Sequence, residues 1–206
     1  MPRATAEPVA IAVLAKAPLP GLAKTRLIPA LGADGAAMLA ARLIERAIAT
    51  AQTAALGPVT LWCAPDERHP VFAAMPQKYG VTLARQPDGD LGARMHEAAV
   101  AANRPALVIG SDCPALTAAH LREAADALRD HDAVLIPADD GGYVLIGLRQ
   151  PCEALFSGMQ WSVASVMAET RRRLRSLGLS WRELAPLWDI DTPENLARLQ
   201  REELLD

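Results

Sequence analysis

The sequence predicts an α/β fold: a single domain in which a mostly parallel sheet lies between two layers of helices. First, short apolar runs alternate with helical patterns along almost the whole chain. Second, these runs are continuously apolar, as in parallel strands that are buried on both faces. Third, no linker, repeat or low-complexity segment divides the 206 residues, of which 51% are hydrophobic. We therefore expect one three-layer α/β/α domain over residues 1–206.

The expected elements follow one another in a regular order. Strands are predicted at 9–15, 59–63, 81–85, 106–109, 133–137 and 143–148, with a weaker strand pattern at 181–187. Helices are predicted at 33–55, 68–78, 91–103, 117–129, 163–177 and 193–204. Thr117 is the expected N-cap of its helix, and Asp191 or Thr192 that of the last helix. In such sheets a ligand binds beyond the carboxyl ends of the strands, so the loops there are the first places to look for chemistry.

The composition narrows the classes of partner. A formal charge of −3 without a basic stripe argues against nucleic acid. The one basic run, at 171–173 and 175, is expected to be a solvated helix face, with phosphate contact as the alternative. Three separated cysteines without C-x-x-C spacing indicate neither disulfides nor zinc, and favour a reducing compartment. The apolar stretch 9–15 is too short to span a membrane and no other segment approaches that length, so we expect a cytoplasmic protein.

The loop after the first expected strand, AKAPLPGLAKTRL, carries three cations. These are Lys16, Lys24 and Arg26, and two prolines and a glycine stiffen and turn the backbone between them. A stiff cationic loop at a strand end suits a diphosphate or triphosphate, and the alternative is a solvated surface loop. Neither a Walker A loop nor the dinucleotide fingerprint G-x-G-x-x-G is present in the sequence.

Aspartates follow the strand at 106–109 and precede the last helix. Asp112 either binds a ligand at its strand end or caps the next turn. Asp189 and Asp191 lie on the same side of an extended backbone, because side chains alternate along it. Carboxylates from two loops suit Mg²⁺ or Mn²⁺, of which Mg²⁺ usually takes only one or two carboxylates from protein. Cys113 is not expected to be a nucleophile, since the sequence places no histidine or positive context beside it.

Two glycine-containing segments complete the candidate site. In Asp139-Asp140-Gly141-Gly142, the glycines permit either a tight hairpin or a close approach of the backbone to a ligand. Asp139 or Asp140 could orient or deprotonate an acceptor hydroxyl there. The segment QPDGDLGAR, at 86–94, could seat a flat base with its amide and glycines, and the alternative is the start of a helix.

Together these segments resemble those of a known family. The motifs are AKAPLPGLAKTRL, QPDGDLGARM, GSDCPAL, PADDGGYVLIGL, the pair Trp161-Ser162, and DIDTPENL. In this order, over nearly the whole chain, they resemble a bacterial family of provisionally assigned glycosyltransferases, some of which are linked to arsenosugar biosynthesis. The same motifs are similar to those of phospholactate guanylyltransferase and, more distantly, of molybdenum cofactor guanylyltransferase. The resemblance implies a GT-A fold, as in the nucleotide-diphospho-sugar transferase superfamily.

The resemblance also implies a role for each motif. Nucleotide phosphates would contact Lys16, Lys24 and Arg26, and the base would lie among Gln86, Gly92 and Arg94. A divalent metal would be bound by Asp112, with Asp191 as the second ligand and Asp189 as the alternative. The acceptor or sugar would face Asp140, Gly141, Gly142 and Tyr143, with Asp140 as the catalytic group. Val163 stands where the family often has threonine, which puts any role of that hydroxyl in doubt.

Three functions fit these expectations. The leading hypothesis is a glycosyltransferase in which Mg²⁺ or Mn²⁺ holds the diphosphate of a sugar nucleotide while the sugar passes to a small-molecule acceptor. The second is a nucleotidyltransferase that releases pyrophosphate from a nucleoside triphosphate; the cationic first loop favours it, because a triphosphate carries more charge. The third is a non-catalytic nucleotide-binding protein, which would be expected to have lost one of the acidic clusters, and both are present.

Overall fold

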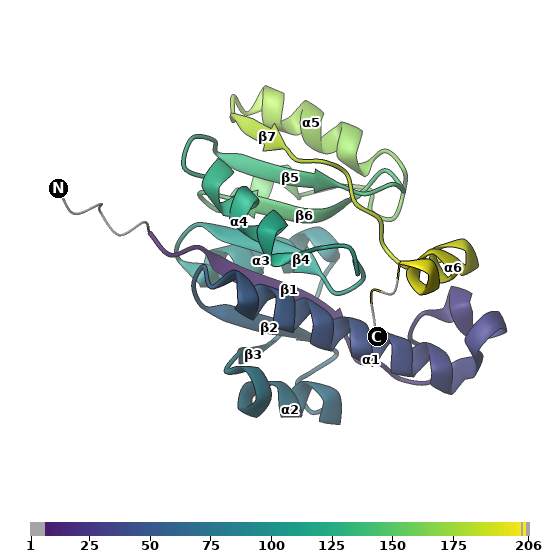
Figure 1. Ribbon diagram of the computed structural model, residues 1–206. Helices are drawn as coiled ribbons and strands as arrows, with labels where there is room; N and C mark the ends of the chain where they lie inside the picture. Colours follow the sequence, from purple (N-terminus) through teal and green to yellow (C-terminus); the bar gives the residue numbers. More distant parts are fainter. Residues whose placement is uncertain (1–6, 203, 205–206) are drawn as a thin grey trace.

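The computed structural model describes residues 7–202 and 204. A seven-stranded sheet has the order β3-β2-β1-β4-β6-β5-β7, with helices packed on both of its faces (Figure 1). The strands are β1 (Ala10–Lys16), β2 (Val59–Ala64), β3 (Thr82–Arg85), β4 (Ala106–Gly110), β5 (Ala133–Pro137), β6 (Tyr143–Leu148) and β7 (Trp181–Glu183). The helices are α1 (Ile28–Ala54), α2 (Pro70–Tyr79), α3 (Leu91–Ala102), α4 (Ala118–Ala127), α5 (Val166–Ser176) and α6 (Pro193–Arg201), with short 3-10 helices η1 (Thr25–Leu27) and η2 (Glu153–Leu155).

Two apolar layers cover the sheet, which confirms the predicted three-layer α/β/α architecture. On one face, α1, α2 and α4 contribute Ile48, Phe72 and Leu121 to a core that includes inward-facing residues of the central strands. On the other face, α3 and α5 contribute Met95 and Met167. A third cluster joins α6 to the start of α1 through Leu39, Leu43, Trp188, Ile190 and Leu199.

The sheet is mostly parallel, as predicted. β1 pairs in parallel with β2 and β4, β2 with β3, and β5 with β7, whereas β6 runs antiparallel to both β4 and β5. Six strands therefore end at one edge of the sheet, and β6 begins at that same edge. The loops that follow β1, β3, β4, β5 and β7 meet there.

The element boundaries differ from the predicted ones where glycine or proline intervenes. α1 begins at Ile28 with a turn that contains Pro29, ahead of the predicted start at 33. Gly32, with φ 72° and ψ 168°, is not helical, so the continuous part of the helix starts at 33, as predicted. β7 ends at Glu183, before the predicted end at 187. Pro186 has no backbone N–H to donate to a neighbouring strand, and Leu187 beyond it forms only an isolated bridge with Ala138. α6 ends at Arg201, with Glu202 as its C-cap, before the predicted end at 204.

Helix caps follow the sequence closely. Thr117 caps α4 by accepting a hydrogen bond from the backbone N–H of His120, as predicted. At α6 the cap is Thr192 rather than Asp191, since the Thr192 hydroxyl accepts from the N–H of Asn195. Asp191 is thereby free of the capping role that the sequence left open.

α1 meets the length and composition test for a membrane-spanning helix, contrary to the expectation that no segment would. Residues Thr25–Ala54 have a mean hydropathy of 1.5 in the most apolar stretch. The core helix of a globular protein passes the same test, and α1 supplies Ile44, Ile48 and Ala51 to the core beside the sheet. The finding is therefore weak evidence for a membrane.

The basic run lies on α5 and is engaged with neighbouring groups. Arg171 pairs with Glu183, and Arg172 and Arg173 both pair with Glu169. Arg173 also donates to the carbonyl oxygen of Ser157 at 2.7 Å. These contacts stabilise the surface of the helix, and none of the four arginines lines the pocket described below.

Candidate functional site

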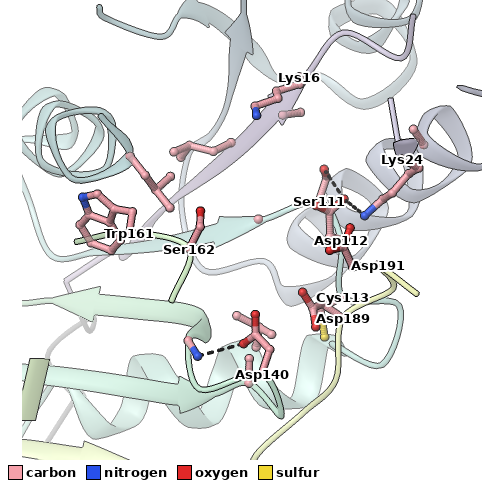
Figure 2. Close-up of a pocket in the computed structure, with 18 of the residues that line it drawn as sticks. Lys16, Lys24, Ser111, Asp112, Cys113, Asp140, Trp161, Ser162, Asp189 and Asp191 are labelled. Carbon is pink, nitrogen blue, oxygen red and sulfur yellow. Dashed lines mark hydrogen bonds and ion pairs between the residues drawn. The ribbon is translucent and has the colours of Figure 1, made fainter. Parts of the chain in front are cut away.

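A pocket of about 520 Å³ opens at the edge of the sheet where six strands end. It is lined by the loops after β1, β3, β4, β5 and β7 and by the segment that precedes α5 (Figure 2). The predicted site residues among its lining are Lys16, Lys24, Gln86, Arg94, Asp112, Asp140, Gly142, Tyr143, Asp189 and Asp191. Three predicted site residues are not among the lining residues, namely Arg26, Gly92 and Gly141.

Lys24 lies at the acidic end of this pocket. Its side chain is only 7% exposed, and its ammonium is 2.9 Å from Oδ1 of Asp112 (Figure 2). The same ammonium donates a hydrogen bond to the carbonyl oxygen of Ile190 at 2.6 Å. Lys24 has a left-handed backbone conformation, with φ 47° and ψ 45°, immediately before η1. A single cation thus contacts the loops that follow β4 and β7.

These two loops are also bonded to each other directly. The backbone N–H of Ile190 donates to the carbonyl oxygen of Asp112 at 2.9 Å. One residue further along, Asp191 forms an ion pair with the exposed guanidinium of Arg26. Both carboxylates that the sequence proposed as metal ligands are therefore paired with cations of the loop after β1.

Asp189 shares the acidic end with Asp112 and Asp140. Its pKa is raised above the usual aspartate range by burial first, and then by the charges of Asp140 and Asp112, while Lys24 opposes the shift. Ile190, between Asp189 and Asp191, is completely buried, and both aspartates line the pocket, in agreement with the predicted alternation. The charge of Asp189 thus interacts with that of Asp112, the first candidate metal ligand.

The fit of a divalent metal can be tested against this donor set. Among the described residues, no three histidine, cysteine or acidic side chains are grouped as a ready-made metal site. Mg²⁺ does not need such a cage, because it commonly binds one or two carboxylates together with substrate phosphates. Asp112, whose side chain is 53% exposed, and the neighbouring Asp189 and Asp191 meet that smaller requirement.

The turn between β5 and β6 is a tight hairpin, one of the two conformations that the sequence allowed. Gly141 has φ 90°, and a Cβ built on it would lie 2.2 Å from the carbonyl oxygen of Ala164. Its own carbonyl accepts from the N–H of Met167 at 2.9 Å. Packing against the segment before α5 is therefore enough to require a glycine at 141, and its predicted contact with the acceptor stays a prediction.

Asp140 is oriented by this hairpin. Its Oδ1 accepts a hydrogen bond from the N–H of Gly142 at 2.9 Å, and its carboxylate is exposed toward the pocket (Figure 2). Asp139, the alternative in the sequence, points elsewhere, since its Oδ2 is 3.6 Å from Nη1 of Arg198 on α6. The geometry thus separates two adjacent aspartates that the sequence did not distinguish.

Aromatic side chains form the wall opposite the acidic end. Trp161 packs on α3 so closely that a Cβ at Gly92 would lie 2.7 Å from its Cζ2. Gly92 therefore makes room for Trp161, and because it is not among the pocket-lining residues, its contact with the base stays a prediction. Tyr143 is half-buried beside Met95, and burial raises the pKa of its hydroxyl, so that it stays protonated.

Gln86 is 6% exposed and its amide is largely committed to the fold. Its Nε2 donates to the carbonyl oxygens of Ala15 and Trp62, at 2.9 and 2.8 Å. Of the amide group, only the oxygen Oε1 is not bonded to the backbone, and it accepts a hydrogen bond from Nη1 of Arg94 at 3.4 Å. Gln86 thus ties β1 to β2 and orients Arg94.

Arg94 and Lys16 are the cations of the pocket that keep donors available. In the part of the chain that the structure describes, no carboxylate forms an ion pair with either residue, and Arg94 Nε is buried without a hydrogen-bond partner. The indole N–H of Trp161 lacks a described partner as well. Both of these N–H groups are buried, whereas the Lys16 side chain is exposed in the pocket.

Cys113 lies in the pocket as an unreactive thiol. Burial raises its pKa to about 12, with help from the charges of Asp189 and Asp112 and against hydrogen bonds from the backbone of Leu116 and Ala115. This agrees with the expectation that Cys113 is not a nucleophile, because the thiolate is the reactive form.

Sequence reasoning gave no role to two groups in the site, Ser162 and the backbone carbonyl of Ile190. Ser162 lines the pocket with a left-handed backbone, φ 61°, which is uncommon outside glycine. The Trp161-Ser162 pair was visible as a motif, but no residue-level signal gave it a role. The carbonyl of Ile190, which binds Lys24, had no sequence signal at all.

Solved structures share this fold. A protein from Desulfovibrio desulfuricans, provisionally named a nucleotide-diphospho-sugar transferase, is 29% identical and superposes with a TM-score of 0.85 over 95% of this chain and 87% of its own. CMP:2-keto-3-deoxy-manno-octonic acid synthetase complexed with CTP is 15% identical, with a TM-score of 0.60 over 96% and 98% of the two chains. Rv0371c from Mycobacterium tuberculosis, complexed with manganese, is 15% identical, with a TM-score of 0.58 over 95% and 99%. No curated protein matches the chain.

The fold is therefore that of the nucleotide-diphospho-sugar transferases, as the resemblance implied. Within that class, the sequence at 47–163 matches a family described as an uncharacterized protein conserved in bacteria, DUF2064. The chain belongs to this family.

Proposed function

We propose that this protein transfers a sugar from a nucleotide-diphospho-sugar to a small-molecule acceptor. The observation that carries the proposal is the meeting, in one pocket, of a cationic loop, the carboxylates after β4 and β7, and the Asp140 hairpin. Cations and a metal-binding acidic group suit a diphosphate, and the hairpin carboxylate suits a hydroxyl acceptor. The similarity to the Desulfovibrio protein, provisionally named for this class of transferase, supports the same assignment.

The chain's own residues would divide the work of such a transfer. Lys16 binds a donor phosphate, and Arg94 donates hydrogen bonds to the nucleotide. Asp112, with Asp189 or Asp191, holds Mg²⁺ or Mn²⁺, which supplies positive charge for the departing nucleoside diphosphate. As the bond from the sugar carbon to the diphosphate breaks, its electron pair stays on the phosphate oxygen. The acceptor oxygen forms the new bond to that carbon, and Asp140 takes the acceptor proton.

Nucleotidyl transfer is the second candidate, and the charge of the loop after β1 favours it. Lys16, Lys24 and Arg26 are more cations than a diphosphate with a metal requires, and a triphosphate would use them all. In that reaction a phosphate oxygen of the acceptor attacks the nucleotide's α-phosphorus, and pyrophosphate leaves. The neighbour that carries CTP supports this candidate through its fold alone.

A ligand screen followed by product analysis tests both candidates. The protein is incubated with sugar nucleotides and nucleoside triphosphates, each with and without Mg²⁺ or Mn²⁺, and thermal shift identifies the ligands that stabilise it. We expect stabilisation by a sugar nucleotide only when metal is present, and release of a nucleoside diphosphate once an acceptor is added. Pyrophosphate release from a triphosphate would replace the first candidate by the second. Binding without turnover, over a broad acceptor panel, would favour a non-catalytic nucleotide-binding protein instead.

A further inference from the structure

At the acidic end of the pocket, the positive charge beside the carboxylates is supplied by the side chain of Lys24. The Lys24 ammonium is nearly buried and contacts both the Asp112 carboxylate, at 2.9 Å, and the Ile190 carbonyl, at 2.6 Å. Next to it, Arg26 is paired with Asp191. Two carboxylates that converge would repel each other, and these cations remove that repulsion.

A divalent metal on Asp112 or Asp191 would lie next to these cations. Lys24 holds Oδ1 of Asp112, so a metal on either oxygen of that carboxylate would lie close to the ammonium, and the two cations would repel each other. The metal and Lys24 therefore compete for Asp112. Phosphate oxygens are the natural alternative partner for a displaced ammonium, because they bear more charge than a single carboxylate.

Lys16 provides an internal comparison. It lies at the end of β1, on the same side of the pocket, and is exposed. Within the described residues it makes no ion pair, so phosphate can reach it without any exchange. Lys16 and Lys24 therefore carry the same charge, but within the part of the chain that the structure describes only Lys24 is already bonded to a carboxylate before a ligand binds.

We propose that Lys24 is an exchangeable counter-ion that couples the binding of metal to the binding of nucleotide. Without nucleotide, Lys24 neutralises Asp112 and weakens metal binding. When a diphosphate enters, Lys24 moves to it and leaves Asp112 to the metal, so each ligand favours the other. Lys24 is thus a positioning residue with two alternative partners. This inference rests on the proposed function, because it assumes a metal and a nucleotide diphosphate in the same pocket.

Metal titration without nucleotide tests the exchange. Binding of Mn²⁺ alone is measured by electron paramagnetic resonance for the wild type, Lys24→Met and the matched control Lys16→Met. We expect Lys24→Met to bind Mn²⁺ about two- to fivefold more tightly than the wild type, the upper part of the range for ion pairs near a protein surface. Lys16→Met should change this affinity less, because it removes a similar charge but no contact with Asp112. Unchanged or weaker Mn²⁺ binding in Lys24→Met overturns the proposal.

Pyrophosphate then tests the coupling, since both candidate reactions place a diphosphate in the pocket. In the wild type, pyrophosphate should increase Mn²⁺ affinity, and Lys24→Met should reduce that increase while binding pyrophosphate itself more weakly. Equal coupling in wild type and Lys24→Met would also overturn the proposal. If the wild type binds neither Mn²⁺ nor pyrophosphate, the proposed function fails as well, so the two failures are distinguishable.

A second variant guards against misfolding of the first. Arg26→Met removes an exposed side chain and its pair with Asp191. We expect a smaller increase in affinity for Mn²⁺ alone, because Arg26 does not contact Asp112. Thermal unfolding of all three variants establishes that they are folded. No increase in either Lys24→Met or Arg26→Met, in folded protein, contradicts the exchange.

Discussion

Gly141 lies against Ala164 so closely that the hairpin after β5 and the segment before α5 form one packed unit. A Cβ at Gly141 would be 2.2 Å from the Ala164 carbonyl oxygen, and the glycine has φ 90°. The Gly141 carbonyl is in turn bonded to the N–H of Met167, at the start of α5. The position of Asp140, one residue earlier, depends on this contact.

Gly141→Ala should therefore destabilise the protein and disturb the site together. We expect a loss of roughly 2–4 kcal/mol in the free energy of unfolding, the sum of left-handed strain and overpacking. Gly178→Ala is the control, since Gly178 also has a left-handed φ but open space around it, and it should cost only about 1–2 kcal/mol. Urea unfolding measures both, and equal losses would mean that the contact with Ala164 is unimportant.

Asp140→Asn should reduce turnover while nucleotide affinity is retained. Asparagine preserves an oxygen that can accept from the Gly142 N–H, so the hairpin should keep its shape. Loss of general-base help typically lowers the rate by about 10²–10⁴-fold. Steady-state kinetics and nucleotide titration measure the two effects. Asp139→Asn is the matched control, because Asp139 faces Arg198 and is not among the pocket-lining residues, and it should retain most of the turnover.

Lys16→Ala should weaken nucleotide binding more than Arg26→Ala. Lys16 lines the pocket without an ion-pair partner among the described residues, whereas Arg26 lies outside the lining and must first leave Asp191. We expect a loss of roughly 1.5–3 kcal/mol for Lys16→Ala, the scale of a hydrogen bond to a charged group. Isothermal titration checks this order. A larger loss for Arg26→Ala would show that the loop rearranges until Arg26 is the main phosphate contact.

Cys113 should resist alkylation over the physiological pH range. Burial raises its pKa to about 12, so the thiolate is scarce between about pH 7 and pH 9. Because the unfolded thiol ionises near pH 8.5, burial of the neutral thiol contributes stability that is full below that pH and is lost as the pH rises toward 12. Iodoacetamide labelling with peptide mass spectrometry measures the rate at each pH. An inflection near 8.5 for Cys113, or loss of turnover in Cys113→Ser, would contradict this account.

The fold was predictable because its signals are local. Continuous apolar runs identify strands that are buried on both faces, and Thr117, a typical N-cap residue, indicates where its helix begins. The boundaries were less exact near glycine and proline. A first turn of α1 before Gly32 was not predicted, and the predicted strand at 181–187 ends at Glu183, before Pro186. Which loops meet in the site was also predictable, because parallel strands end at one edge.

The contacts between those loops were not predictable in the same way. The glycine at 92 is required by Trp161, and the glycine at 141 by Ala164, in each case through close packing between distant segments. The sequence contains the residues but not the distance between them, so both glycines were assigned to ligands. Similarly, the position of Lys24 in the sequence does not indicate that its partners are Asp112 and the Ile190 carbonyl, which are far away along the chain.

The reversed direction of β6 has a consequence for how this scaffold can diversify. Because β6 starts where its neighbours end, the chain leaves β5 and enters β6 through one short turn (Figure 1). Residues of that turn line the pocket. That turn and the segment at 161–165 touch each other, while the loop after β1 contacts the loops that follow β4 and β7. The turn and the segment could thus be exchanged together without changing any other strand connection. Under the proposed function, new acceptor preferences would arise from exchanging this pair, while the loops proposed to bind the nucleotide stay unchanged.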